Sequence, residues 1–144
     1  MTPRSVHVLA QQAEIESTSG RLDEAVSTLS NALELGRRRG DRCWEAELHR
    51  LQGETVLQGC ESPNPDPGAL KEVETCYRRA LATAREQSAK SLELRGATSL
   101  AELLGQQTRF DEAREILEPV YGWFVEGLAT RDLKRAETLL QELR

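Results

Sequence analysis

Apolar residues recur at helical spacing along nearly the whole chain, and this pattern predicts an all-α protein. One stretch in the middle of the chain places on the same helical side Trp44, Leu48, Leu51 and Leu57. A second stretch, after a proline-rich segment, does so with Val73, Tyr77, Ala80, Leu81 and Ala84. Gly53 lies among the large residues of the first stretch, and its missing side chain leaves room for another helix to approach. We therefore expect the two stretches to form a helical hairpin.

The same spacing before and after this hairpin predicts further helices. We expect helices over about residues 3–18, 22–39, 43–59, 69–87, 91–106, 110–127 and 131–143. Gly20 and Gly40 follow the first two, where glycine readily takes the left-handed conformation that ends a helix. Residues 60–68 hold three prolines at alternate positions and predict a loop, because proline removes backbone donors and favours extended backbone.

Four single residues carry further expectations about these helices. Ile15 and Val26 are assigned to the buried sides of the first and second helices. Pro119 is expected to kink the sixth helix. Thr130 is a candidate N-cap for the seventh.

An internal repeat is visible in the letters. Residues 21–25, RLDEA, return as RFDEA at 109–113, a shift of 88, and the Ala-Leu pair at 32–33 returns at 80–81, a shift of 48. A period of 40 with eight extra residues in the proline-rich loop explains both shifts. We predict a single domain over 1–144 with three helical hairpins, at about residues 3–40, 41–88 and 89–128, and a capping helix over 130–143.

The first helix of each predicted pair has a small residue at a fixed place, and the second has the pattern Ala-x3-aromatic/Leu-x2-Ala. Together these features resemble the tetratricopeptide repeat. That resemblance implies a right-handed superhelix, although the period of 40 departs from the usual 34. Three segments resemble the C-terminal end of large bacterial signalling proteins: WEAELHRLQGE (44–54), YRRAL (77–81) and PVYGWF (119–124). In these proteins a nucleotide cyclase or DNA-binding regulator domain precedes a predicted ATPase and a tetratricopeptide-like tail. The resemblance covers roughly residues 40–143 and implies a tail of such a protein.

The composition indicates which classes of partner and which cellular location to expect. The chain is 38% hydrophobic and 30% charged, with a net charge of −5, so as a whole it repels nucleic acid and anionic membrane. No apolar run approaches the roughly 20 residues that span a bilayer. The three cysteines are an odd number without a CxxC pair, which indicates reduced thiols and a cytoplasmic location.

The sequence offers little chemistry of its own. It contains no GxxxxGK[ST] or GxGxxG phosphate-binding loop. The two histidines, His7 and His49, lie far apart and no tetrahedral set of ligands accompanies them. No nucleophile elbow or ordered triad is present. We expect no catalysis, no cofactor and no metal, and hence a function in binding.

In tetratricopeptide-like arrays the first helix of each pair lines the concave groove, and the resemblance therefore implies a set of partner-binding residues. They are His7, Glu14, Glu47, Arg50, Glu54, Arg95, Thr98 and Glu102. The functional interpretation is a groove that binds a peptide carrying both charges. The other interpretation is that these are solvated or mutually paired surface charges, such as Arg50 with Glu54.

The ends of the array raise two further expectations. Tyr121, Trp123 and Phe124 are interpreted as packing between the sixth and seventh helices, or alternatively as an exposed patch for self-association or docking. The first helix has no preceding cap and is expected to expose an apolar edge that allows homo-oligomers.

The leading function is a non-catalytic protein-interaction or regulatory module, the C-terminal part of a bacterial signalling ATPase or cyclase. The alternative is a small-molecule sensor with its ligand in the groove.

Overall fold

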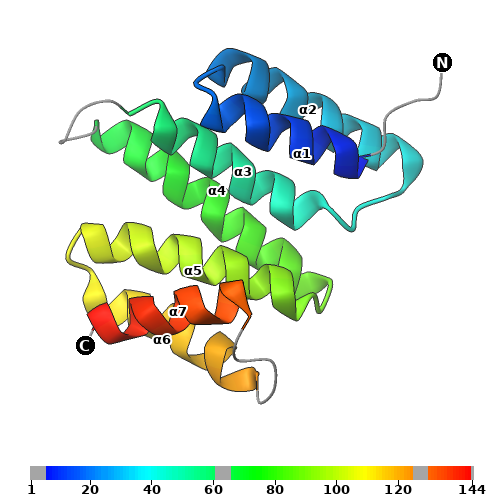
Figure 1. Cartoon of the computed structure of the whole chain (residues 1–144). Coiled ribbons are helices and arrows are strands. Elements are labelled where there is room, and N and C mark those ends of the chain that lie inside the picture. The colour runs from blue at the N-terminus through cyan, green and yellow to red at the C-terminus, as the bar shows by residue number, and fades with distance from the viewer. Residues whose placement is uncertain (1–5, 61–65, 125–129, 144) are drawn as a thin grey trace. The chain divides into compact units, whose positions relative to one another are not determined.

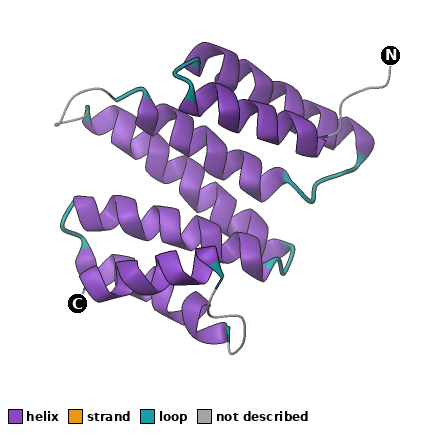
Figure 2. Ribbon diagram, viewed as in Figure 1, coloured by secondary structure: helices purple, strands orange, loops and turns teal. Residues whose placement is uncertain are grey.

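The computed structural model describes residues 6–60, 66–124 and 130–143, and all regular structure in these ranges is helical (Figure 2). The helices, labelled in Figure 1, are α1 (Val6–Thr18), α2 (Leu22–Arg39), α3 (Glu45–Gln58), α4 (Pro67–Glu86), α5 (Lys90–Gln106), α6 (Phe110–Trp123) and α7 (Arg131–Glu142). The predicted all-α class is confirmed. The chain forms two compact units, Met1–Ala80 and Leu81–Arg144, whose boundary falls inside α4.

The first unit is built around the α1–α2 hairpin, on which α3 packs. Its core combines small and large aliphatic side chains from the three helices: Val6, Ala10, Ala13, Leu29, Ala32, Leu48 and Leu51. Alanines let the helix axes come close, and the leucines and valine supply most of the buried apolar area, about 1.5–3 kcal/mol for each large side chain. The α3 helix then meets α4 at Gly53, where the ring of Tyr77 lies against the glycine.

The second unit is built around the α5–α6 hairpin, and α7 packs on both of its helices. The buried apolar residues of α5 include Leu94, Ala97, Leu100, Ala101 and Leu104. Those of α6 are Ala113, Leu117 and Val120, and those of α7 are Leu133, Ala136 and Leu140. The side of α7 that holds Leu133, Ala136 and Leu140 is thus covered within this unit.

Backbone conformations recur at the same shifts of 88 and 48 residues as the sequence repeats. Gly20 has a positive φ of 81°, and Thr108, 88 positions later, has a positive φ of 61°. Gly40 has a φ of 68°, and Ser88, 48 positions later, has a φ of 53°. Each of these residues lies in the turn after a helix, in the left-handed region that glycine favours. The predicted helix ends at Gly20 and Gly40 are confirmed, and two non-glycine residues adopt the same turn.

The predicted end of α6 is wrong, and α3 and α4 each begin two residues from the predicted start. The α6 helix ends at Trp123, and Phe124 has extended backbone with φ −82° and ψ 124°; residues 125–127, which the prediction included, lie outside the described ranges. The α4 helix begins at Pro67, which lies inside the predicted loop. Proline is well placed there because the first helical N–H has no partner in the helix, and the Leu70 N–H donates to the Asp66 carbonyl at 3.1 Å.

Two side chains assigned to the core are exposed. Ile15 is 59% exposed, because it lies about 200° around α1 from the buried Ala13 and Ser17. Val26 is 51% exposed and lies beside the buried stripe of α2. The α6 helix continues through Pro119, where a kink stays a prediction. Thr130 is the N-cap residue of α7, without a side-chain bond to the helix.

Candidate partner-binding surfaces

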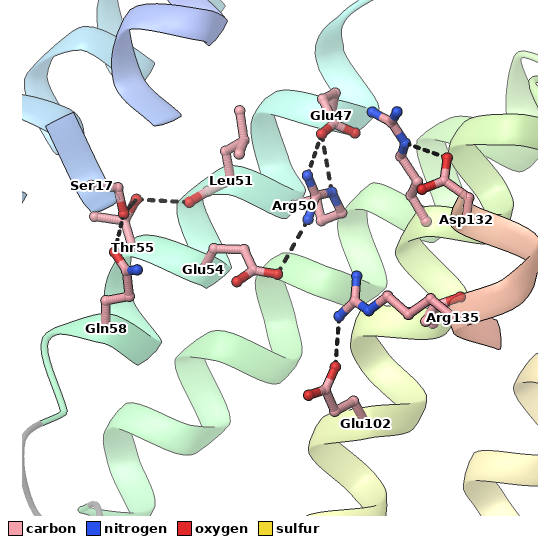
Figure 3. Close-up of polar contacts among 12 residues, drawn as sticks. Ser17, Glu47, Arg50, Leu51, Glu54, Thr55, Gln58, Glu102, Asp132 and Arg135 are labelled. Atoms are coloured by element: carbon pink, nitrogen blue, oxygen red, sulfur yellow. Dashed lines mark hydrogen bonds and ion pairs between the residues drawn. The ribbon is translucent and has the colours of Figure 1, made fainter. Parts of the chain in front are cut away.

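Three of the predicted groove residues converge on one face of α3, as Figure 3 shows. The Arg50 Nε donates to Glu47 Oε1 at 3.1 Å, its Nη2 donates to the same oxygen, and its Nη1 donates to Glu54 Oε1 at 3.2 Å. Burial by itself would lower the pKa of Arg50, but the hydrogen bond and charge of Glu47, with the charge of Glu54, raise that pKa above its usual value. The guanidinium is therefore held as a cation between two carboxylates.

This polar triad, defined as Glu47, Arg50 and Glu54, is unequally exposed. The side chains of Glu47 and Arg50 are 7% and 13% exposed, whereas that of Glu54 is 34% exposed. The structure thus shows the i,i+4 pairing of Arg50 with Glu54 that the second interpretation of these charges named. Within the triad, Glu54 is the member most accessible to a partner.

The predicted residues of α1 lie apart from one another. His7 is exposed and its ring stacks on Trp44, with ring centroids 4.5 Å apart. Glu14 is exposed on the same helix. Close by, buried polar residues join the helices: Thr28 Oγ1 donates to Glu16 Oε1 at 2.6 Å, and Thr55 Oγ1 lies 3.4 Å from Ser17 Oγ. The first helix is therefore held in place by specific polar contacts as well as by apolar packing.

In the second unit, two predicted residues of α5 form ion pairs with α7. The Arg95 Nε lies 2.9 Å from Asp132 Oδ2, and the Arg135 Nη2 lies 2.6 Å from Glu102 Oε2. A hollow of about 340 Å³ opens beside the second pair and is lined mainly by α7. Thr98, in contrast, is 2% exposed and donates its hydroxyl to the Leu94 carbonyl at 2.7 Å, so it is not at a surface.

The three aromatic residues at the end of α6 are not equally packed. Trp123 is 57% exposed, and the Lys90 ammonium lies 5.4 Å from the centre of its ring, a cation–π distance. Phe124 meets the same ring edge-on at 5.1 Å, and Tyr121 is half-buried. The interpretation that Trp123 packs between α6 and α7 is therefore wrong. A docking role for the exposed ring stays a prediction.

A groove that the sequence did not predict lies in the first unit, between α2, α3 and α4. Its volume is about 330 Å³. Val26, Leu29, Val56 and Cys76 supply its apolar lining. The exposure of Val26 is thereby explained, since this side chain forms part of the wall. A sequence signal does exist: Val26 and Val56 lie one position off the buried stripes of Ala25 and Thr55.

The outer side of α1 carries a second apolar feature, which we call the α1 stripe and define as Val8, Gln11 and Ile15. Val8 is 43% exposed and Ile15 is 59% exposed. The residues 40 positions later, Leu48, Leu51 and Thr55 of α3, are at most 5% exposed. Leu48 and Leu51 belong to the core with α1 and α2, and Thr55 reaches Ser17 of α1. The counterparts 88 positions later, Gly96, Ser99 and Leu103 of α5, are buried as well.

The described residues offer little reactive chemistry. No group of three or more His, Cys, Asp or Glu among them is placed to hold a metal ion. Cys43 is exposed, but its thiol donates to Asp41 Oδ1 at 2.9 Å, and this bond, with partial burial and the carboxylate charge, raises the pKa of Cys43. Burial raises the pKa of Cys76. Both thiols are thus less nucleophilic at neutral pH than an ordinary cysteine.

Comparison with known proteins adds no assignment. No protein-family model, no curated protein and no solved structure matches this chain. Among the described residues, no helix is both long and apolar enough to cross a lipid bilayer.

Proposed function

We propose that the chain is a non-catalytic protein-interaction module whose α1 stripe docks a helical hairpin. The observation that carries the proposal is the difference in burial between equivalent positions. Val8 and Ile15 are exposed, whereas their counterparts Leu48 and Thr55 are covered by the α1–α2 hairpin. Because helical repeats bury their apolar faces by stacking, the stripe is the position at which one more hairpin fits.

The occupant has a definable chemistry. The surface that covers α3 in the first unit is made of small and aliphatic side chains of a hairpin: Ala10, Ala13, Leu29 and Ala32. A hairpin with that composition can bury the exposed parts of Val8 and Ile15, which are 43% and 59% exposed. The gain is about half of the roughly 1.5–3 kcal/mol that full burial of each side chain gives. Such a hairpin comes from a second copy of this chain, from another part of a longer parent protein, or from a separate protein.

The test introduces a charge into the stripe. Val8→Glu places a carboxylate in the docking surface, and Ser30→Glu places one at an exposed position of α2 as the matched control. A photoreactive amino acid at position 15 or 30 reports what lies against each position in extracts of the source cells. We expect cross-links to a helical segment from position 15 only, lost when Val8→Glu is added and kept when Ser30→Glu is added. Equal cross-linking from both positions, or none from position 15, would contradict the proposal.

The mass of the native protein distinguishes the sources of the hairpin. We propose that this chain is the C-terminal tail of a cytoplasmic bacterial signalling protein, which the resemblance of residues 40–143 supports. An antibody to the segment should then detect a product far larger than 16.1 kDa, and the cross-link should fall within that same product. A product of 16.1 kDa that associates with itself in sedimentation velocity, and loses this association in Ile15→Glu, indicates a homo-oligomer instead.

A second candidate function, a small-molecule sensor, is favoured by one observation in the other unit. The hollow of about 340 Å³ beside the Arg135–Glu102 pair is at the lower end of the volumes of ligand sites. Its lining is charged in both signs, so a small zwitterionic metabolite is the class that it suits. Thermal stabilisation of the chain by such a metabolite, absent in Glu102→Gln, would support the sensor. Retention of the stabilisation in Glu102→Gln would argue against it.

A further inference from the structure

The groove between α2, α3 and α4 is a separate surface from the α1 stripe. It also lies on the side of α3 away from the polar triad. Gln52 and Val56 line it, and each follows a triad residue, Arg50 or Glu54, by two positions. Two positions correspond to about 200° around a helix. The first unit therefore has a self-paired polar face on one side of α3 and an apolar groove on the other.

The two ends of the groove differ in charge. Glu72 and Arg79 both line it from α4 and are seven residues apart, which is about 10 Å along the helix axis. Both side chains are exposed, and neither forms an ion pair with another residue in the described ranges. Cys76 lies between them and is half-buried. The α4 wall of the groove thus carries an anion at one end and a cation at the other. The rest of the lining is mixed: Thr75 and Gln52 are polar, and Val26, Leu29 and Val56 are apolar.

From this arrangement we propose that the groove binds an amphipathic helix of a partner protein. Its face carries a basic residue at position i, apolar residues at i+3 and i+4, and an acidic residue at i+7. The basic residue pairs with Glu72 and the acidic residue with Arg79, so that the bound helix runs parallel to α4. The apolar pair lies against Val26, Val56 and the thiol of Cys76.

The spacing of the charges selects a helix over an extended segment. Residues i, i+3, i+4 and i+7 of a helix lie on one face and span about two turns, the distance from Glu72 to Arg79. A strand covers about 10 Å in three residues, and its side chains alternate between faces. Two charges three residues apart in a strand therefore point in opposite directions, and only one of them can reach the groove.

The charge pattern gives a direct test with two synthetic peptides of equal net charge. The charged peptide is an Ala/Gln-based helix with Lys, Leu, Leu and Glu at i, i+3, i+4 and i+7, and the neutral peptide has Gln in place of both the Lys and the Glu. Binding is measured by fluorescence anisotropy at low ionic strength. We expect the whole chain to bind the charged peptide about fivefold more tightly, the combined effect of two weak exposed ion pairs.

Three variants complete the test, all at exposed positions that leave the core intact. The double variant Glu72→Gln/Arg79→Gln, which keeps the net charge of the chain, should bind the two peptides equally. Val26→Gln should weaken both peptides several-fold, since it replaces part of the apolar wall. Ile15→Glu, on the α1 stripe, should change neither. Equal binding of the two peptides by the wild-type chain, a preference for the charged peptide that persists in the double variant, or no binding to wild type would overturn the inference, while leaving the proposal for the α1 stripe to its own test.

Discussion

The ring of Tyr77 occupies the space that a side chain on Gly53 would need. A Cβ on Gly53 would lie 2.6 Å from Cε1 and 2.9 Å from Cδ1 of Tyr77, and 3.2 Å from Cβ of Cys76. Tyr77 is 1% exposed, so its ring is enclosed and cannot turn outward without disturbing its neighbours. The ring of Tyr77 on α4 thus lies directly against the backbone of α3 at this position, which explains why a glycine stands in the middle of α3.

Gly53→Ala should therefore destabilise the protein although alanine is the better helix former. Overpacking of a filled core typically costs about 1–3 kcal/mol, and the gain in helix propensity offsets about 1 kcal/mol of that. We expect the free energy of unfolding, from urea denaturation, to fall by up to about 2 kcal/mol. Gly122→Ala is the matched control, because a Cβ there meets nothing within 4 Å. It should leave the stability unchanged or raise it by up to about 1 kcal/mol.

A second prediction concerns the repeated turn. Thr108 has a φ of 61° at the position equivalent to Gly20, and a β-branched residue is strained in that region. Thr108→Gly should raise the free energy of unfolding by about 0.5–1 kcal/mol, measured by thermal and urea denaturation. Thr130→Gly is the control, because Thr130 has a φ of −66°, and it should lower stability. A loss of stability in Thr108→Gly would show that the turn is not strained.

The sequence predicted the helices and their register well, because both depend on local periodicity. The shifts of 88 and 48 recur in the backbone at Gly20 and Thr108 and at Gly40 and Ser88. Gly53 was correctly assigned to a close helix contact, since a lone small residue among large ones implies a neighbour. Side-chain exposure was predicted less well. Ile15 was assigned to a buried stripe, although its exposure depends on which faces of α1 have neighbours, and this is a tertiary property.

The candidate surfaces were predicted only in part, for the same reason. The Arg50–Glu54 pair follows from an i,i+4 spacing within one helix. The Arg95–Asp132 and Arg135–Glu102 pairs join residues more than 30 positions apart, and no local pattern indicates them. The groove beside Val26 needs three helices to be placed before it exists. The residues that line this groove are all present in the sequence, but their arrangement in space depends on how the three helices pack.

The third prediction concerns Glu45 of α3, whose carboxylate lies close to three basic side chains. Glu45 Oε2 lies 2.6 Å from Arg42 Nε, and Glu45 Oε1 lies 3.7 Å from His49 Nε2 and 3.9 Å from Arg37 Nη2. The hydrogen bond from Arg42, against a smaller opposing effect of burial, and the charges of Arg42, His49 and Arg37 lower the pKa of Glu45 below its ordinary value of 4.5. The carboxylate is thus more acidic in the folded protein than in the unfolded chain.

A lowered folded-state pKa means that Glu45 contributes its full stabilisation above about pH 5 and loses it as the pH falls below 4.5 through the folded pKa. Glu45→Gln, which cannot ionise, removes that contribution. Urea denaturation of both proteins from pH 5 to pH 3 should show a stability difference that shrinks as the pH falls below 4.5. A difference that stays constant over the whole range would mean that Glu45 has the same pKa folded and unfolded.

The last prediction concerns Arg50, which the sequence suggested as an accessible groove residue. Its guanidinium is nearly buried and bonded to Glu47, so its removal leaves the buried Glu47 carboxylate without that cation. Breaking a buried pair on one side typically costs about 3–5 kcal/mol, and we expect about 2–4 kcal/mol for Arg50→Met, which keeps most of the aliphatic packing. Urea denaturation measures this loss.

Two companion variants distinguish lost pairing from lost packing. Arg50→Met/Glu47→Leu removes both charges and should recover most of the loss, because an apolar pair of similar size tolerates burial. Glu54→Gln, at the more exposed end of the triad, should cost less than about 1 kcal/mol. If the double variant is as unstable as Arg50→Met, the cost lies in packing. A binding test of this face should consequently use Glu54→Gln, because reduced binding in Arg50→Ala could not be separated from partial unfolding.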